Sequence, residues 1–192
     1  MSELEFDAVS HAYKVNGVAV PSVTQILADV RLIDLSMVPQ VFFARACEFG
    51  GVVHQATDYS DRGILDENSI DKEVLSNVKA WRAFISDHDV KIFEVEKRVY
   101  SKKFKFAGTL DRVGLVGGEL CIIDIKTGVK QRAYACQTAA YALAYTEMTG
   151  EKIRDRYCVY LLENSYKVDK HTDRLDENMF LNALSLYNYK MR

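Results

Sequence analysis

Two aspartates and a lysine in the middle of the chain have the types and the spacing that suit metal-dependent hydrolysis. Asp111 comes three residues after Gly108. Asp124 and Lys126 follow about thirteen residues later. Converging carboxylates repel each other unless a cation lies between them, and all-oxygen ligation favours a hard ion such as Mg²⁺ or Mn²⁺. A neighbouring lysine can orient or help to deprotonate a water molecule, or stabilise charge that builds up on a phosphate.

The strands that must position these groups are visible in the hydropathy pattern. Residues 119–126 are apolar on both alternating rows, which is typical of a buried central strand. Asp124 and Lys126 share one row and lie at the end of that strand. A Gly-Gly turn joins it to the preceding strand, 105–116, so Asp111 can meet Asp124 near the edge of the sheet. An exposed Asp–Lys pair on an edge strand is the alternative explanation, but such a strand would not be apolar on both rows.

Further polar residues could complete such a site. His54 follows Gly50 in a G-x-x-x-H spacing at a helix start. It could bind the metal through a neutral ring nitrogen, although a lone histidine is usually structural. Glu96, on the strand before the hairpin, could contact a substrate or metal, or could simply face solvent. Gln137 and Tyr141 are four residues apart and share a helix face, where a surface glutamine and a core tyrosine are the alternative.

Basic residues flank this constellation, although the chain as a whole is slightly acidic. Its formal net charge is −2, so any affinity for nucleic acid must come from local placement of charge. We expect phosphate contacts from five residues on the two sides of the site: Lys102, Lys103, Lys105, Lys130 and Arg132. A solvated charged loop explains the same residues equally well.

Turn and capping residues mark the remaining elements. Asn16-Gly17 between two β-rich runs predicts a hairpin over 11–20. Ser22 and Gln25 form a capping box that predicts the start of a helix. Further along the chain we expect a helical stretch from 39 to 59 that Gly50-Gly51 interrupts, and a helix at 70–87. Strands at 90–100, 105–116 and 119–126, a helix at 133–148, strands at 154–162 and 166–171, and a helix at 175–190 follow. This order predicts an α/β fold with a mixed β-sheet flanked by helices.

Composition and length bound the class of protein. The 192 residues, 48% of them hydrophobic, are enough for a single domain with a full core, comprising hairpin and helices over about 1–88 and the catalytic sheet with its helices over about 89–192. No apolar run reaches the ~18–20 residues of a membrane span. The acidic start lacks the apolar core of a secretion signal, and the four cysteines form no C-x-x-C pair. We therefore expect a cytoplasmic (intracellular) protein without a zinc-ribbon or iron–sulfur site.

Taken together, these motifs resemble those of the PD-(D/E)xK nuclease superfamily, in particular its RecB-like, phage-type exonuclease branch. The motifs are, in order, Gly50-x-x-x-His54, Glu96, Gly108-x-x-Asp111, Asp124-x-Lys126 and Gln137-x-x-x-Tyr141. The resemblance covers about residue 21 to the C-terminus. Leu110 stands where the superfamily name has proline, and the second acid is Asp124 rather than Glu, as in the RecB-like branch. The cysteine cluster of the iron–sulfur relatives is missing.

The resemblance implies a restriction-endonuclease-like sheet and a DNA exonuclease that depends on Mg²⁺ or Mn²⁺. By position, His54, Asp111 and Asp124 resemble the metal ligands, and the Ile125 backbone carbonyl is a further one. Lys126 resembles the catalytic lysine. Glu96, Gln137 and Tyr141 are assigned to substrate binding, and the last two resemble the motif that positions the nucleic-acid strand or the catalytic lysine.

The biological setting that this resemblance implies is DNA recombination or repair in a phage or prophage. DNA is the expected partner, and a recombination or annealing protein, a helicase or a further copy of the chain are candidates, whereas no membrane is expected. Three alternatives stay open: an endonuclease of the same fold, a nucleic-acid-binding protein without catalysis, and a protein-interaction module.

Overall fold

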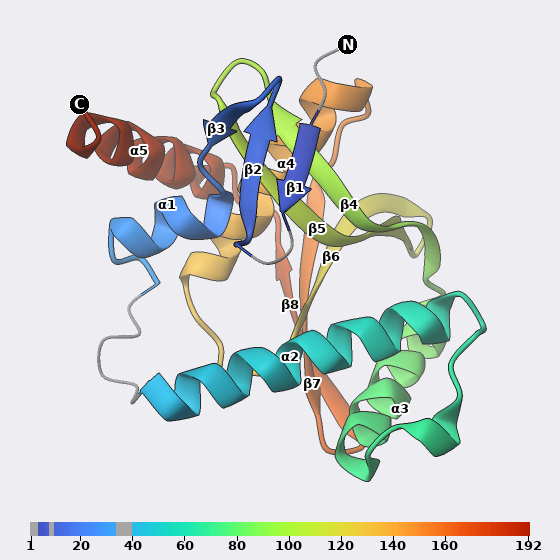
Figure 1. Ribbon diagram of the computed structural model, residues 1–192. Helices are drawn as coiled ribbons and strands as arrows, with labels where there is room; N and C mark the ends of the chain where they lie inside the picture. The colour runs from blue at the N-terminus through green and yellow to red at the C-terminus, as the bar shows by residue number, and fades with distance from the viewer. Residues whose placement is uncertain (1–3, 8–9, 34–39) are drawn as a thin grey trace.

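The computed structural model describes residues 4–7, 10–33 and 40–192, and a five-stranded sheet forms its centre (Figure 1). In spatial order the strands are β4 (Lys91–Ser101), β5 (Phe106–Val116), β6 (Glu119–Lys126), β7 (Asp155–Leu162) and β8 (Ser165–His171). β6 and β7 are parallel and are joined through helix α4 (Ala133–Thr149), whereas the other neighbouring strands are antiparallel. The predicted mixed sheet flanked by helices is therefore confirmed.

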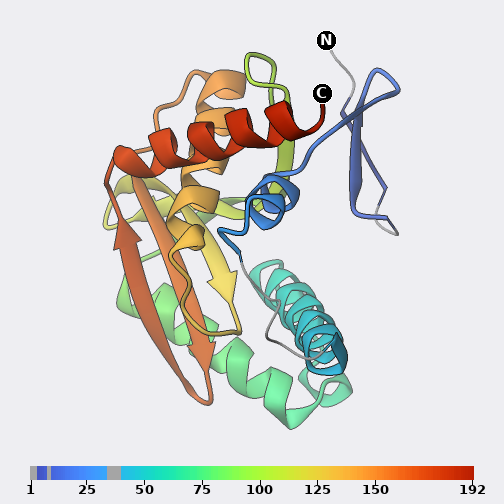
Figure 2. The ribbon, with the colours of Figure 1, turned by 90° about the vertical axis from the view of Figure 1, so that its left-hand side faces the viewer.

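Helices cover both faces of this sheet (Figures 1 and 2). One face packs against α1 (Val23–Asp29), α4 and α5 (Leu175–Lys190), the other against α2 (Gln40–Asp61) and α3 (Lys72–Asp87), and η1 (Glu67–Ser69) lies between α2 and α3 in the chain. Ile122 belongs to the apolar core on the first face, and Ile123 belongs to the core on the second. The central strand β6 is therefore buried on both sides, as its two apolar rows predict.

A three-stranded antiparallel sheet precedes α1 in the chain. Its strands are β1 (Leu4–Asp7), β2 (Ala12–Val15) and β3 (Val18–Val20). The predicted hairpin is confirmed, with Asn16 and Gly17 at φ values of 50° and 77° in its turn. The sequence analysis did not predict β1, because four residues show too little pattern on their own and depend on pairing with β2. A hydrogen bond of 2.7 Å between the Tyr13 and Thr109 hydroxyls attaches this small sheet to β5.

Helix ends follow the predicted capping residues. The Gln25 N–H donates to the Ser22 hydroxyl at 3.0 Å, which starts α1 with a capping box. Gly150 ends α4 in the left-handed conformation that glycine favours. The predicted second helix is present as α2, but Pro39, its expected first residue, lies outside the described residues. The expected helix start at Gly50 is wrong, because α2 continues through Gly50 and Gly51 and His54 lies in its interior. Among the described residues, no helix combines the length and apolar character needed to cross a membrane.

Candidate active site

Asp111 lies where β5 and β6 separate. The paired ladder between these strands ends at Arg112 and Ile123, one residue short of Asp111 and Asp124. Beyond that point, Asp111 Oδ2 accepts a hydrogen bond of 2.6 Å from the Ile125 N–H. The carboxylate thus replaces a ladder hydrogen bond at the end of the paired region, where it is only 8% exposed. This contact fixes the position of Asp111 relative to the end of the central strand.

Asp124 and Lys126 share one row of β6, as predicted, and form an ion pair with 2.6 Å between Asp124 Oδ2 and Lys126 Nζ. The same ammonium donates to Gln137 Oε1 at 3.1 Å, and Gln137 Nε2 donates to the Tyr141 hydroxyl at 3.1 Å. Helix α4 therefore positions Lys126 through a continuous chain of hydrogen bonds. Asp124 is 2% exposed, and the thiol of Cys158 on β7 lies 3.9 Å from its Oδ2 atom.

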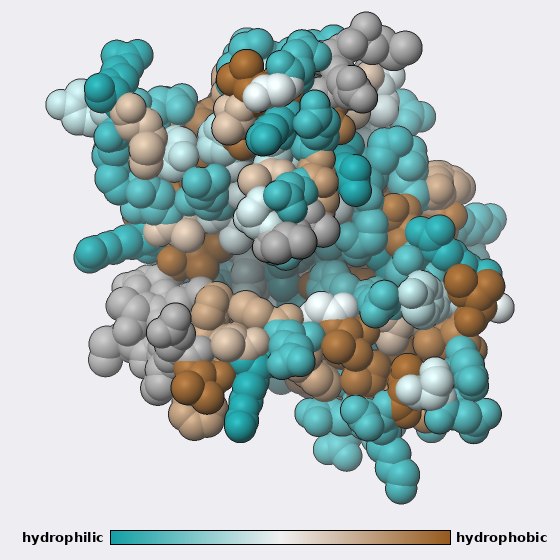
Figure 3. Space-filling model, viewed as in Figure 1, coloured by the Kyte–Doolittle hydropathy of each residue, from teal (hydrophilic) through white to brown (hydrophobic). Residues whose placement is uncertain are grey.

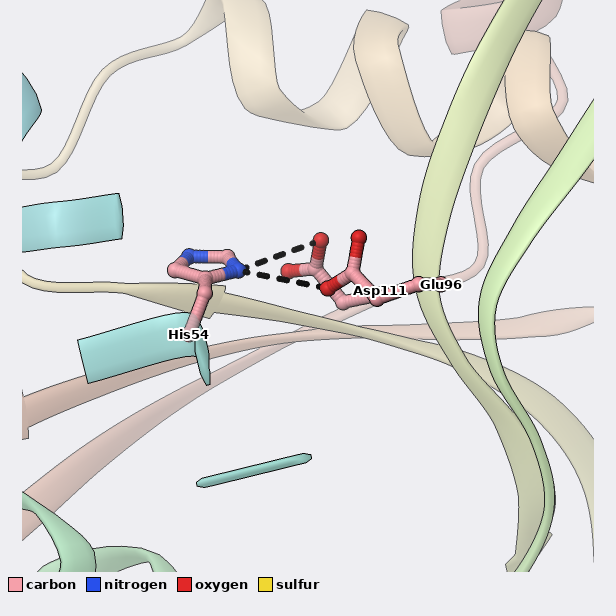
Figure 4. Close-up of side chains that lie close together, drawn as sticks. All are labelled: His54, Glu96 and Asp111. Atoms are coloured by element: carbon pink, nitrogen blue, oxygen red, sulfur yellow. Dashed lines mark ion pairs between the residues drawn. The ribbon is translucent and has the colours of Figure 1, made fainter. Parts of the chain in front are cut away.

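His54 reaches the site from α2, as Figure 4 shows together with Glu96 and Asp111. Its Nε2 atom lies 3.1 Å from the Ile125 carbonyl oxygen. Its Nδ1 atom lies 3.5 Å from Asp111 Oδ1 and 3.8 Å from Glu96 Oε1. One possible ligand atom from each of these three side chains lies within 4.8 Å of the other two. Two carboxylates and an imidazole suit a divalent cation such as Mg²⁺ or Mn²⁺, so these residues fit the implied metal.

The backbone of Glu96 explains how it joins this group. Glu96 has a φ of 49°, in the left-handed region that residues other than glycine rarely adopt. The β4–β5 pairing includes Val95 with Arg112 and Lys97 with Leu110, but not Glu96 with Asp111. Such strain costs on the order of 1–3 kcal/mol and clusters at functional sites. The distortion turns Glu96 towards His54, and hydropathy alternation alone could not have predicted it.

Electrostatic interactions couple the buried groups. Burial raises the pKa of Asp124 to about 6 against the opposing effect of Lys126, and the charge on Asp111 adds to the increase. Burial also acts to raise the pKa of Asp111, but His54, Lys126 and the Ile125 N–H together lower it to about 2. Burial disfavours the charged form of Lys126, yet its two carboxylate neighbours hold its pKa above the usual range.

The same carboxylates act on His54. Burial acts to lower its pKa, but Asp111 and Glu96 together raise it to about 10. A positive charge is therefore favoured at the point where the imidazole meets Asp111 and Glu96. A divalent cation would satisfy the same preference, and the metal would compete with the ring proton for Nδ1.

The structure divides the predicted site residues into groups. In the described part of the chain, Asp124 is not in the group of His54, Glu96 and Asp111. It is paired with Lys126, although the charge on Asp111 still acts on it. The five predicted phosphate contacts lie in two other places. Lys102, Lys103 and Lys105 are on the turn between β4 and β5, and Lys130 and Arg132 directly precede α4. Lys130 pairs with Asp169 at 2.8 Å, and the Lys103 N–H donates to Glu147 at 2.8 Å.

The molecular surface is hollowed between α2 and the part of the molecule that carries β1–β3 (Figure 3). Helix α2 carries His54, and the Tyr13–Thr109 contact joins the small sheet to β5, two residues from Asp111.

An acid–acid–lysine set at the end of the central strand, with a histidine and a glutamate beside it, places this mixed α/β fold in the class of nuclease-type hydrolases. The model of the PD-(D/E)XK nuclease superfamily matches residues 66–178, and the chain belongs to this superfamily. The match includes Glu96, Asp111, Asp124 and Lys126, whereas His54 precedes it.

Two solved structures with low sequence identity resemble this fold. "Crystal structure of SSO0001" has 14% identity and a TM-score of 0.39, and the alignment covers 73% of each chain. The alkaline exonuclease LHK-Exo from Laribacter hongkongensis has 12% identity and a TM-score of 0.43, with 89% of this chain and 87% of that chain covered. No curated protein matches the sequence.

Proposed function

We propose that the protein is a DNA exonuclease that hydrolyses phosphodiester bonds with the help of Mg²⁺ or Mn²⁺. The observation that supports this most directly is the convergence of Asp111, Asp124 and Lys126 at one end of β6, with His54 facing them from α2. These groups come from the neighbouring strands β5 and β6 and from α2, which is distant in the chain. Burying their charges together carries a desolvation penalty, which is a poor way to gain stability alone. We also propose that residues 1–192 form a single nuclease domain.

We propose that His54, Asp111 and Glu96 hold the metal, because their ligand atoms lie together. Asp124, which the sequence predicts as a further ligand, is paired with Lys126 and would have to turn towards Asp111 to join them. The Ile125 carbonyl oxygen, also predicted as a ligand, accepts from His54 Nε2, whereas Asp111 and Glu96 lie beside Nδ1 on the other edge of the ring. When bound, a divalent cation supplies Lewis-acid activation of a water molecule and stabilises charge on the phosphate.

Lys126 acts as a fixed positive charge in this proposal. Asp124 and Gln137 hold its ammonium in place, and its pKa above the usual range keeps it protonated at neutral pH. A protonated amine cannot accept the proton of a water nucleophile. Lys126 therefore orients the nucleophile by hydrogen bonding and stabilises negative charge as it develops on the phosphate. Gln137 and Tyr141 contribute by restricting the position of that ammonium.

Variants that keep the shape of each side chain test the catalytic assignment. Asp111→Asn retains an acceptor for the Ile125 N–H, Asp124→Asn retains the size of the side chain, and Lys126→Met retains its apolar stem. With end-labelled linear DNA and Mg²⁺, we expect wild-type cleavage that EDTA abolishes, and cleavage at background level in all three variants. Glu119→Gln, at the exposed opposite end of β6, is the matched control and should cleave as wild type does. Full activity of any of the three folded variants would refute its assigned role.

Comparing linear with covalently closed circular DNA distinguishes an exonuclease from an endonuclease, since an exonuclease requires an end. Digestion of the closed circle would replace the exonuclease proposal with its endonuclease alternative. We also expect binding of DNA to an Asp111→Asn variant to weaken as salt increases, with a shallower dependence when Lys130 is replaced by Ala. The setting in phage recombination or repair, the protein partners, the oligomeric state and the cytoplasmic location stay predictions.

A further inference from the structure

Arg112 is a fully buried arginine directly after Asp111, and its guanidinium contacts four structural elements. Its Nε donates to Asp61 Oδ2 at 2.6 Å, and one terminal nitrogen donates to the Thr57 hydroxyl at 3.1 Å, both on α2. The guanidinium also lies 5.7 Å from the centre of the Trp81 ring on α3. The Trp81 indole N–H binds the other oxygen of Asp61 at 2.7 Å, so both oxygens of that buried carboxylate are used.

The remaining contacts of Arg112 lead to the three residues that could bind a metal. Its other terminal nitrogen donates to the Asp111 carbonyl oxygen at 2.8 Å and lies 3.6 Å from Glu96 Oε1. Thr57, which accepts from Arg112, donates in turn to the His54 carbonyl oxygen at 2.8 Å. One guanidinium is thus connected to His54, Glu96 and Asp111 by one intermediate hydroxyl, one ion pair and one backbone hydrogen bond.

The local course of β5 shows that this contact affects the geometry of the site. In a regular strand, consecutive side chains lie on opposite faces. Asp111 and Arg112 are consecutive, yet both contact residues of α2, namely His54 and Asp61. Glu96, at left-handed φ, lies at the corresponding position of β4. The irregularity in both strands therefore occurs at the point where Arg112 binds.

A contribution to the stability of the fold does not by itself explain why an arginine is buried at position 112. Burying an arginine and an aspartate carries a desolvation penalty that can exceed their attraction, and apolar residues of similar size often stabilise a fold at least as well. The planar guanidinium offers five donors in fixed directions, whereas a lysine ammonium is a point charge on a flexible stem. We propose that Arg112 is the positioning residue of the candidate metal site, and that it sets the separation of His54, Glu96 and Asp111 through the fixed geometry of its guanidinium.

This inference rests on the proposed function, because it concerns the same site, and Mn²⁺ binding tests it separately from DNA cleavage. Titration calorimetry with Mn²⁺ is carried out on wild type, Arg112→Lys and Thr57→Val. Thr57→Val removes the hydroxyl between Arg112 and His54 while nearly preserving side-chain volume. Thr138→Val is the matched control, since Thr138 is also a fully buried helical threonine bonded to a backbone carbonyl, but without an arginine partner.

We expect the Kd for Mn²⁺ to increase about 10–100-fold in Arg112→Lys, as is typical when a residue that orients metal ligands is changed, and about tenfold in Thr57→Val. Thr138→Val should bind Mn²⁺ as wild type does. The Mn²⁺ concentration for half-maximal DNA cleavage should increase in parallel with the Kd. If Arg112→Lys does not fold, Thr57→Val decides the question.

An unchanged Kd in folded Arg112→Lys, or equal Kd values in Thr57→Val and Thr138→Val, would overturn the inference. Failure of the proposed function has a different signature, since the wild-type protein would then bind Mn²⁺ without cleaving DNA. In that case a weaker Mn²⁺ affinity in the two variants would still support the positioning role of Arg112.

Discussion

Replacing Gly108 by alanine should disturb both the core and Lys126, the candidate catalytic lysine. A Cβ atom at Gly108 would lie 2.5 Å from Tyr141 Cε1 and 3.2 Å from its Cδ1. Carbon atoms in contact are normally about 3.5–4.0 Å apart, so the ring and the strand must separate by about 1 Å. The Tyr141 ring is buried against the core of α1 and α4 and has little space to move. Its hydroxyl accepts from Gln137, which in turn accepts from Lys126.

The expected size of the effect follows from these contacts. Overpacking a well-packed core costs about 1–3 kcal/mol, and this overlap places Gly108→Ala near the upper value. The smaller conformational freedom of alanine in the unfolded chain offsets about 1 kcal/mol. The net loss of about 2 kcal/mol corresponds to a decrease in Tm of about 4–8 °C for a chain of this size. A shift of about 1 Å near reacting groups can cost on the order of 100-fold in rate, so we expect cleavage to decrease at least about tenfold.

Urea unfolding measures the stability, with fluorescence of the single buried Trp81 as the signal. Gly51→Ala is the control, because a Cβ atom there meets nothing within 4 Å and alanine favours helix α2, so stability should increase by about 1 kcal/mol. Leucine at position 141 would end short of the Cε1 position, so the cost of Gly108→Ala should largely disappear in a Tyr141→Leu background. An equal cost of Gly108→Ala in both backgrounds would show that the Tyr141 ring is not the cause.

Three further predictions concern other parts of the molecule. A Cβ atom at Gly114 would overlap the carbonyl oxygen of Lys91, which is backbone and cannot turn aside, so Gly114→Ala should cost about 3 kcal/mol or more in the same urea experiment. A thiol reagent should modify exposed Cys47 in the native protein, whereas Cys121, whose pKa burial raises to about 12, should react only after unfolding. Burial lowers the pKa of His171 below its usual 6.5, so the unfolded chain binds this proton more tightly and stability should fall as pH drops through 6.5. His171→Asn should make the free energy of unfolding depend less steeply on pH between about pH 7 and 5. An unchanged slope of that free energy against pH would contradict the prediction.

Local patterns predicted the features that depend on a few neighbouring residues. The Asn16-Gly17 turn and the capping box at Ser22 are confirmed because each is determined by backbone angles and hydrogen bonds within four residues. The shared row of Asp124 and Lys126 follows in the same way from strand alternation, and the structure adds that the two side chains form an ion pair. Features that depend on neighbouring strands could not be predicted. Glu96 is turned by a distortion of β4, which no alternation of hydropathy in its own strand reveals.

Arg112 shows the same limit more clearly. In the sequence it is one of 25 basic residues, next to a candidate catalytic aspartate, and regular alternation would place the two side chains on opposite faces. Its burial becomes evident only when Asp61 of α2 and Trp81 of α3 are brought together around it. The position of Arg112 therefore depends on tertiary contacts with residues up to about fifty positions away in the chain, which the spacing of the motifs does not reveal.

Ile125 connects the two halves of the candidate site through its backbone. Its N–H binds Asp111 and its carbonyl oxygen lies at hydrogen-bond distance from His54, while its side chain fills the core under α2 and α3. The flanking Asp124 and Lys126 point to the opposite face, where Gln137 of α4 holds the ammonium. Because side chains alternate along the strand, Lys126 and His54 lie on different faces of β6, although each is next to the backbone of Ile125. In the proposed function, a phosphate at the end of β6 would meet Asp111 on one side of the Ile125 peptide unit and the Lys126 ammonium on the other.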